Sequence, residues 1–452
     1  MNLAELAQRF IAVDSSFSHG TRDLARWVAQ LANEWGLESK IVEDSIAGVA
    51  QANVLIQFKN SSATGDLALT TRLDTHEPGE YSQWIKTGAN PFSASVSGDS
   101  IYGLGAADSK LDFLCKLMAF KELSQSGATH SNAVLIGTYG RESGSGAIRL
   151  LRKKQVAPKA VLIGAPTALR LANRAPGYAK IEISVSLTDQ EKKYLERHNQ
   201  TEAGQTQSKI FSKISSNMLG PTIYDNAIIR MIDYLKNVPS GMAIIGIDGG
   251  TSPEVAPDLV ELELDLVDSI ENGIGEKVVK IGDAIKHLAT ELMSLRDENF
   301  SPAYSTINLG MIRMYSEEVK ISGVCRLIPA ADRTIYEVWL DRLRKECSSV
   351  GAKFQIIDYK PPLITEEGGQ FIQFLKKEAA SKGLETQLAA AALCTEANVF
   401  HRMGIECAVF GPGRAVESDK NALESVGIRD LEAAVEFYKS VINNYKPNEL
   451  GG

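Results

Sequence analysis

The stretch LALTTRLDT, residues 67–75, runs an apolar strand into a polar turn. The turn carries Arg72 and Asp74 where the strand is expected to end. In an open α/β sheet, binding and catalytic groups gather at the carboxyl ends of the strands, so this turn is a candidate site. Arginine has no lone pair to give and stays protonated, so Arg72 cannot be a metal ligand.

Three more stretches follow predicted strands or turns in the same way. They are IYGLGAADSK (101–110), GTYGRESGSGA (137–147) and IGAPT (163–167). Each alone is also explained by ordinary turn chemistry, and Asp108 in the first is a good helix amino-terminal cap. Their order along the chain, each at the end of a strand, indicates that they form one candidate site.

The alternation of helices and strands favours an α/β fold with a mostly parallel sheet flanked by helices. Apolar residues at helical spacing predict helices, and short apolar runs ending in glycine predict buried strands. The helices are expected at 3–12, 21–35, 107–124, 146–154, 367–381 and 429–443, and the strands at 51–58, 67–71, 132–140, 160–165 and 405–411.

The sequence pattern changes between the predicted strand at 160–165 and the predicted helix at 367–381. YAKIEISVSL (178–187) alternates with period 2, as a half-exposed antiparallel strand does. The polar segment 187–209 is expected to be a surface excursion. We therefore predict a peptidase-like α/β domain over 1–174 plus 361–452, interrupted by a smaller α+β lid or dimerisation domain over 175–360.

The composition is that of an ordinary globular protein, with 44% hydrophobic and 23% charged residues in 452. The net charge of −8 gives no electrostatic reason to expect nucleic acid or an anionic membrane as partner. No apolar run approaches 18 residues, and the amino terminus is too polar for a signal peptide, so a cytoplasmic location is expected. The five cysteines are scattered and form no CxxC pair, which indicates reduced thiols.

The strand-end motifs together resemble the zinc-dependent exopeptidase and deacylase family of acetylornithine deacetylase, succinyl-diaminopimelate desuccinylase and carboxypeptidase G. The glycine-rich motif is intact as GLGAADSK (103–110). Other motifs are recognisable in altered form as RLDT (72–75), GRE (140–142), GAPT (164–167), GPG (411–413), VESD (416–419) and Glu424. The resemblance covers nearly the whole chain, is weakest over 187–300, and implies the family's two-domain zinc-exopeptidase fold.

The resemblance also implies a site where two zinc ions share a bridging carboxylate and activate a water for hydrolysis. Three of its carboxylates are present. Asp108 corresponds to the bridging carboxylate, and Glu142 to a ligand of the second metal. Asp74 corresponds to the carboxylate that orients the first histidine ligand, which is absent here.

The remaining positions of the family's site carry other residues. Arg72 replaces the first metal's histidine, Ala165 replaces its glutamate, and Arg141 replaces the general base. The last histidine ligand falls at Asp419 by count from the GPG motif, with Glu417 or Ser418 as the alternatives. The first metal position thus loses two of its three ligands.

Three interpretations of the remaining carboxylates and the two arginines stay open. Asp108, Glu142 and Asp419 form an oxygen-only set, which suits magnesium, calcium or manganese better than zinc. Against any metal, a guanidinium about 4 Å from a dication costs roughly 8 kcal/mol at an effective dielectric near 20. We therefore favour the hypothesis that Arg72 and Arg141 occupy the metal positions and pair with the carboxylates. The other possibility is that both arginines point into solvent.

The inserted domain carries two further candidates by resemblance. The family's lid histidine, which stabilises the oxyanion across a dimer, falls at Asn217 or, in a second register, at Ile214. The family's carboxylate-binding arginine corresponds to Arg326, which is equally explained as an edge-strand arginine. The resemblance further implies a homodimer through the lid domain.

These substitutions favour a homologue that has lost zinc-dependent hydrolysis and has a binding, regulatory or scaffolding role. Its ligand is expected to be a small carboxylate or a peptide, and no cofactor is expected. The alternative is an active amidohydrolase, dipeptidase or deacetylase with one divalent ion (manganese, magnesium or zinc) in a rearranged site. A third possibility is metal-free chemistry on an anionic substrate in the arginine-rich cleft.

Overall fold

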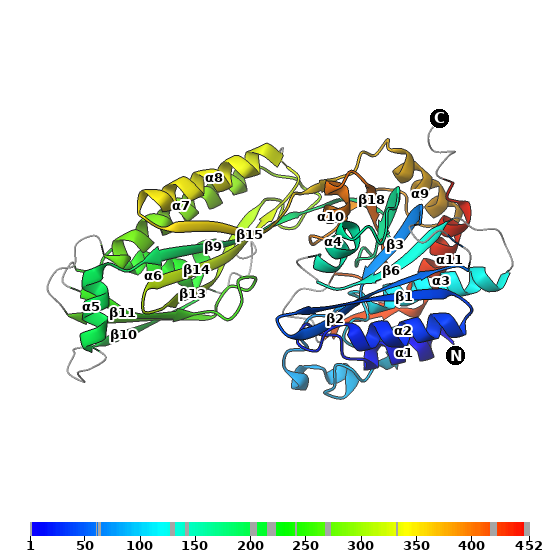
Figure 1. The fold of residues 1–452 in the computed structure, drawn as a ribbon, viewed down its shortest axis with the longest axis horizontal. Helices are drawn as coiled ribbons and strands as arrows, with labels where there is room; N and C mark the ends of the chain where they lie inside the picture. The colour runs from blue at the N-terminus through cyan, green and yellow to red at the C-terminus, as the bar shows by residue number, and fades with distance from the viewer. Residues whose placement is uncertain are drawn as a thin grey trace. The chain divides into compact units, whose positions relative to one another are not determined.

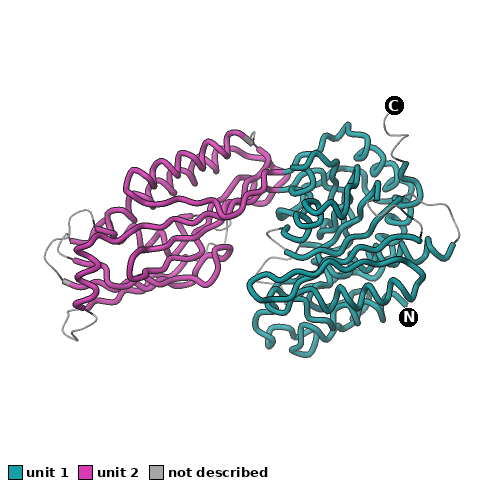
Figure 2. Tube along the Cα trace, in the orientation of Figure 1, with its two compact units in different colours: residues 1–175, 363–452 teal, residues 176–362 magenta. Residues whose placement is uncertain are grey.

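The computed structural model describes residues 2–59, 61, 65–126, 132–140, 144–198, 206–214, 223–239, 242–266, 273–330, 333–415 and 423–446. The chain divides into two compact units (Figure 2). Unit 1 holds Met1–Ala175 and Leu363–Gly452, and unit 2 holds Pro176–Pro362. These divisions lie one and two residues from the predicted domain boundaries.

Unit 1 is built on a mixed sheet with a parallel centre (Figure 1). The strand order is β1-β2-β6-β3-β7-β18-β8-β16, with β17 beside β8, and neighbours from β6 to β18 run parallel. The strands are β1 (Glu38–Ile46), β2 (Val49–Gln57), β3 (Leu67–Arg72), β6 (Ala133–Thr138), β7 (Ala160–Ile163), β8 (Ala172–Ala175), β16 (Leu363–Ile364), β17 (Ala389–Ala390) and β18 (Glu406–Val409). A small separate sheet joins β4 (Ser95–Ser97), β5 (Ser100–Tyr102) and β19 (Ser425–Gly427).

Helices cover both faces of this sheet, and all residues of its central strands β3, β6 and β7 are buried. One core packs against α1 (Leu3–Ala12), α2 (Arg22–Glu34), α3 (Lys110–Ser126), α9 (Gln370–Ser381) and α11 (Ile428–Asn444). The core on the other face packs against α4 (Ser145–Arg152) and α10 (Ala397–Arg402). Unit 1 is therefore a three-layer α/β domain, as predicted.

Unit 2 is a separate antiparallel sheet of order β10-β12-β11-β13-β14-β9-β15. Its strands are β9 (Gly177–Ser186), β10 (Gln207–Ser212), β11 (Met242–Gly249), β12 (Leu259–Leu266), β13 (Thr306–Met314), β14 (Glu318–Leu327) and β15 (Lys353–Lys360). Its helices are α5 (Asp189–His198), α6 (Ala227–Leu235), α7 (Ile274–Ser294) and α8 (Arg333–Ser349). The core of unit 2 combines apolar residues of α6, α7 and α8 with one face of the sheet. The predicted α+β class of the inserted domain is thus confirmed.

The described residues of the predicted surface excursion over 187–209 include helix α5 and the start of strand β10. Glu191 is the buried residue of α5. The helix therefore lacks the buried apolar stripe by which a helix is usually predicted from sequence. Polar contacts hold it: Glu191 accepts the backbone N–H of Ile274 at 2.6 Å, and Tyr194 donates to the buried Asp265 at 2.5 Å. Among the described helices, none is long and apolar enough to cross a membrane.

A buried ion pair joins helix α3 to the end of strand β3. The Lys116 ammonium donates to Asp112 at 2.9 Å, to the hydroxyl of Thr71 at 2.7 Å and to the carbonyl of Thr70 at 2.9 Å. Thr71 and Tyr438 both donate to the same carboxylate. A buried pair is tolerated only where its hydrogen bonds are satisfied, and here the ammonium has three acceptors. The pair therefore fixes the position of the strand that carries Arg72.

Gly164 leaves the space that this ion pair needs. A Cβ atom at Gly164 would lie 1.9 Å from the Asp112 Oδ2 atom and 2.3 Å from the Thr71 hydroxyl. Its backbone N–H donates to the Thr70 carbonyl at 2.7 Å, so the backbone cannot move away without loss. Glycine at this position follows from packing.

We predict that Gly164→Ala lowers the free energy of unfolding by about 2 to 4 kcal/mol, because the added methyl group displaces a buried charged pair. Urea unfolding followed by circular dichroism measures this change. Gly368→Ala is the matched control, since a Cβ atom there meets nothing within 4 Å. Equal stability of the two variants would contradict this role of Gly164.

Candidate functional site

The site lies at the carboxyl end of β3, between β6 and β7. The Leu73 N–H donates to the Thr138 carbonyl of β6 at 2.8 Å. The Ser15 hydroxyl donates to the Leu73 carbonyl at 2.7 Å, and the Thr75 N–H donates to the Ser15 carbonyl at 3.1 Å. These bonds hold the turn after β3 on both sides, so the polar residues of that turn have fixed positions.

Arg72 forms an ion pair with Asp108. The guanidinium Nη2 atom lies 2.7 Å from the Asp108 Oδ1 atom, and the two side chains are 8% and 13% exposed. A charge-assisted bond of this length in a nearly buried setting is strong, because water screens it little. Arg72 therefore places positive charge beside Asp108, the carboxylate that the sequence resemblance predicts as the bridging ligand.

Glu424 fixes the turn that carries Asp108 by accepting hydrogen bonds from its backbone. This buried carboxylate accepts the backbone N–H groups of Gly105 at 2.9 Å, Ala107 at 2.8 Å and Asp108 at 2.8 Å. Burial raises the pKa of Glu424 to about 7, and the three N–H donors oppose that rise. The conformation of the glycine-rich turn thus depends on a carboxylate more than 300 residues away in the chain.

Asp74 and Ala165 complete the described part of the predicted site. Asp74 is buried and accepts the Gly140 N–H at 3.1 Å, so its carboxylate braces the loop that follows β6. Ala165 is buried just beyond the end of β7. Its methyl side chain offers no ligand atom, whereas the resemblance predicts that family members carry a glutamate at this position.

Glu396 is a further acidic group beside this site, and it was not predicted from the sequence. It precedes α10, is 2% exposed, and accepts the Thr70 hydroxyl at 3.0 Å. Burial raises the pKa of Glu396 to about 7, the positive charge of Arg72 lowers it, and the negative charge of Asp74 raises it. Arg72 therefore interacts with the charges of Asp108 and Glu396 in one buried cluster. The only sequence signal was the pair Thr395-Glu396 at a helix start, which is also typical of a helix cap.

Several predicted site residues lie outside the described residues. They are Arg141, Glu142, Asn217 and Asp419, together with the alternatives Glu417 and Ser418. The structure therefore brings together Arg72, Asp74 and Asp108 from the predicted set. Within the described part of the chain, no group of three or more histidine, cysteine, aspartate or glutamate side chains is arranged to hold a metal ion.

Arg326 lies in unit 2, on strand β14. Its guanidinium stacks 5.6 Å from the ring centre of Phe300 and donates to the Pro302 carbonyl at 3.2 Å. Burial lowers the pKa of Arg326 to about 10, so it stays positively charged at neutral pH. A carboxylate-binding role for Arg326 stays a prediction. Ile214, the alternative lid position, is 52% exposed.

We predict that Arg72→Met lowers the free energy of unfolding by about 2 to 4 kcal/mol, because Asp108 loses its cation in a nearly buried place. Asp108→Asn in the same background should recover part of the loss, and a double-mutant cycle of urea unfolding measures the coupling. Arg26→Met is the control, since the Arg26–Glu43 pair has a similar distance of 2.6 Å but is about half exposed. That control should lose less than about 1 kcal/mol. Equal losses in the two variants would contradict a buried Arg72 pair.

We also predict a pH dependence of stability that comes from Glu396. Its folded pKa of about 7 lies above the ordinary glutamate value of 4.5, so between these pH values the folded protein keeps a proton that the unfolded chain releases. Stability from this group is therefore present below about pH 4.5 and declines as the pH rises toward 7, by up to about 1.4 kcal/mol per pH unit. Unfolding of wild type and Glu396→Gln from pH 4.5 to 8 measures it. Parallel curves for the two proteins would contradict this assignment.

Comparison with known proteins identifies the relatives of this chain. The model of the peptidase family M20/M25/M40 matches residues 68–444. A probable succinyl-diaminopimelate desuccinylase of Staphylococcus epidermidis is 21% identical over 435 residues, which cover 94% of this chain and 93% of the relative. An acetylornithine deacetylase of Aliivibrio fischeri is 25% identical over 175 residues, 39% of this chain and 44% of the relative.

Solved structures show the same fold at low sequence identity. A tripeptidase from Staphylococcus aureus has a TM-score of 0.58 and 15% identity, with 97% of this chain and 96% of that chain covered. An M20 family metallo-carboxypeptidase from Sulfolobus solfataricus has a TM-score of 0.58 and 14% identity, with 98% of both chains covered. Since the family model spans most of the chain, this protein belongs to the peptidase family M20/M25/M40.

Proposed function

We propose that this chain is a non-hydrolytic member of its family that binds a small carboxylate or a short peptide. The observation that carries the proposal is the ion pair of 2.7 Å between Arg72 and Asp108. In this account the guanidinium replaces a metal ion as the cation of the site. The buried pair then serves structure and ligand binding, and no activated water forms there.

The described residues do not fit the dinuclear metal centre of the family. Arg72 already occupies the side of Asp108 that faces β3, and a dication about 4 Å from it would be disfavoured by roughly 8 kcal/mol at an effective dielectric near 20. Ala165 contributes no donor atom. The free energy of this repulsion is of the same order as the total metal-binding free energy of many protein sites.

The ligand class follows from the positive charges and from the relatives. Arg72 and Arg326 each hold a permanent guanidinium in a partly buried setting, and guanidinium groups bind carboxylates in a two-pronged geometry. The named relatives include a desuccinylase, a deacetylase and peptidases, whose names indicate amide-bonded substrates. N-acyl amino acids and dipeptides are therefore the first ligands to test.

The test combines three measurements on the full chain. We expect fewer than about 0.1 equivalents of zinc, manganese or magnesium per chain after gel filtration, because of the charge repulsion at Arg72. We expect no hydrolysis of N-succinyl or N-acetyl amino acids or dipeptides with any of the three ions. We expect at least one of these compounds to raise the melting temperature, and Arg326→Gln to weaken that shift.

Arg72→His combined with Ala165→Glu is the matched variant, because it restores two of the family's donor positions. It should bind more zinc than the wild type does. Turnover by the wild type that a chelator abolishes and manganese restores would contradict the proposal and favour the active amidohydrolase. The absence of both turnover and any stabilising ligand would contradict the binding role.

A further inference from the structure

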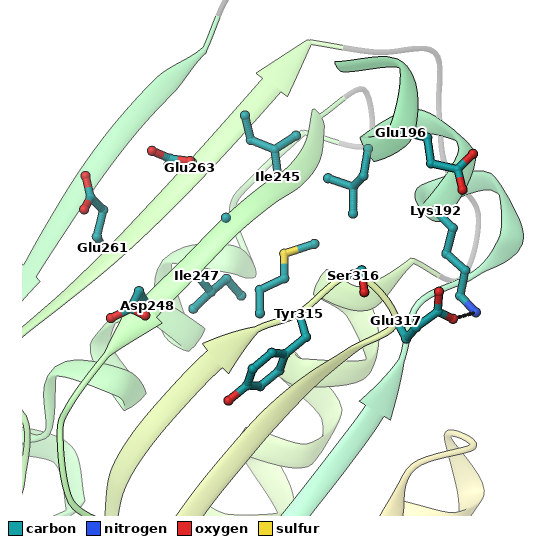
Figure 3. Close-up of a pocket in the computed structure, with 13 residues that line it drawn as sticks. Lys192, Glu196, Ile245, Ile247, Asp248, Glu261, Glu263, Tyr315, Ser316 and Glu317 are labelled. Atoms are coloured by element: carbon teal, nitrogen blue, oxygen red, sulfur yellow. Dashed lines mark hydrogen bonds and ion pairs between the residues drawn. The ribbon is translucent and has the colours of Figure 1, made fainter. Parts of the chain in front are cut away.

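A cavity of about 470 Å³ lies within unit 2 (Figure 3). Helix α5, strands β11 and β12 and the hairpin that joins β13 to β14 surround it. All of its lining residues fall between Lys192 and Glu317, so the cavity belongs to unit 2 alone. It is separate from the Arg72 site, which is built from residues of unit 1.

Within the described residues, strand β11 has an edge beside the cavity that β13 covers only in part. β11 pairs with β12 from Met242 to Gly249, but it pairs with β13 only at Asp248 and Gly249 among the described residues. The reason is that β13 ends at Met314 and the chain turns back into β14. Residues 242–247 of β11 therefore extend beyond β13. An open strand edge offers backbone N–H and C=O groups to an added strand.

The floor of the cavity is partly apolar. Gly246 carries no side chain, and a Cβ atom there would come within 2.6 Å of the Glu263 carboxylate. Ile245 sits at a bulge in β11, and Leu195 and Met314 line the walls beside it. Figure 3 shows Ile245 and Ile247 on the strand at the centre of the cavity. Apolar side chains of a bound segment would be desolvated on this floor.

The walls of the cavity are strongly acidic. Five of its lining residues are acidic and one, Lys192, is basic; the acidic residues are Glu196, Asp248, Glu261, Glu263 and Glu317. Lys192 pairs with Glu317, and Arg313 pairs with Asp248 at 2.7 Å. Within the described residues this leaves Glu196, Glu261 and Glu263 without an ion pair.

We propose that this cavity is a docking site for an extended, basic segment of another polypeptide. The segment adds to the open edge of β11 as a short strand. Successive side chains of a strand point to opposite faces, so lysine or arginine at every second position reaches Glu261 and Glu263. The residues between them contact the apolar floor beside Ile247.

The acidic walls, the net charge of the protein and the edge of β11 together favour a basic peptide strand over other partners. A second copy of this protein is a poor occupant, because its net charge of −8 repels the acidic walls. A free polyamine satisfies the carboxylates but leaves the backbone groups of β11 unpaired. A basic peptide strand satisfies both, and complementary charge speeds its association.

The first experiment measures fluorescence anisotropy with a labelled acetyl-Lys-Val-Lys-Val-Lys-Val-amide and the full chain. We expect a dissociation constant of about 10 µM or tighter at low salt, and weaker binding as salt rises. The matched glutamate-valine peptide should not bind. A version N-methylated at alternate amides should bind at least about tenfold more weakly, because it cannot pair with a strand edge.

The second experiment uses variants of the cavity, each checked for an unchanged melting temperature. Glu261→Gln with Glu263→Gln should weaken binding about tenfold, and Gly246→Val should abolish it by filling the floor. Glu298→Gln is the control, since its carboxylate is 78% exposed and pairs with Arg296 outside the cavity. The proposal is overturned by equal binding of the N-methylated peptide, by wild-type affinity of the cavity variants, or by failure of the basic peptide to bind.

Discussion

The ion pair between Arg72 and Asp108 is the interaction on which the character of this site depends. A carboxylate that is 13% exposed is stabilised by a nearby cation, and the Arg72 guanidinium 2.7 Å away supplies positive charge. In our proposal, this pair takes the position from which a family enzyme would activate water. Our proposed function therefore depends on whether Asp108 pairs with the Arg72 guanidinium or with a metal ion.

The surrounding structure places this pair through two buried anchors on either side of β3. Thr71 connects to the Asp112–Lys116 pair of helix α3, which is close-packed against Gly164. Thr70 connects to Glu396 at the start of α10. Adjacent residues of a strand point to opposite faces, so one strand end is bound to both helical layers of unit 1. The guanidinium thus projects from a rigid support.

The fold, and the location of Arg72, Asp74 and Asp108 at a strand end or in turns, could be predicted from the sequence, because strand-end motifs depend on local spacing. Glu396 could not, since it lies 326 residues from its partner Thr70 and its local signal is that of a helix cap. The Asp112–Lys116 pair has the spacing of an exposed helix pair, yet both side chains are buried. Helix α5 was missed because polar contacts hold it, and periodicity reports only apolar faces.

The most direct measurement is a crystal structure of the full chain grown with about 1 mM zinc, with data collected at the zinc absorption edge. Our account predicts guanidinium density beside Asp108 and no anomalous peak between Asp74 and Asp108. A zinc peak at coordination distance from Asp108, about 2.0 to 2.2 Å, with Arg72 turned away from it, would contradict the replacement of the metal by the guanidinium.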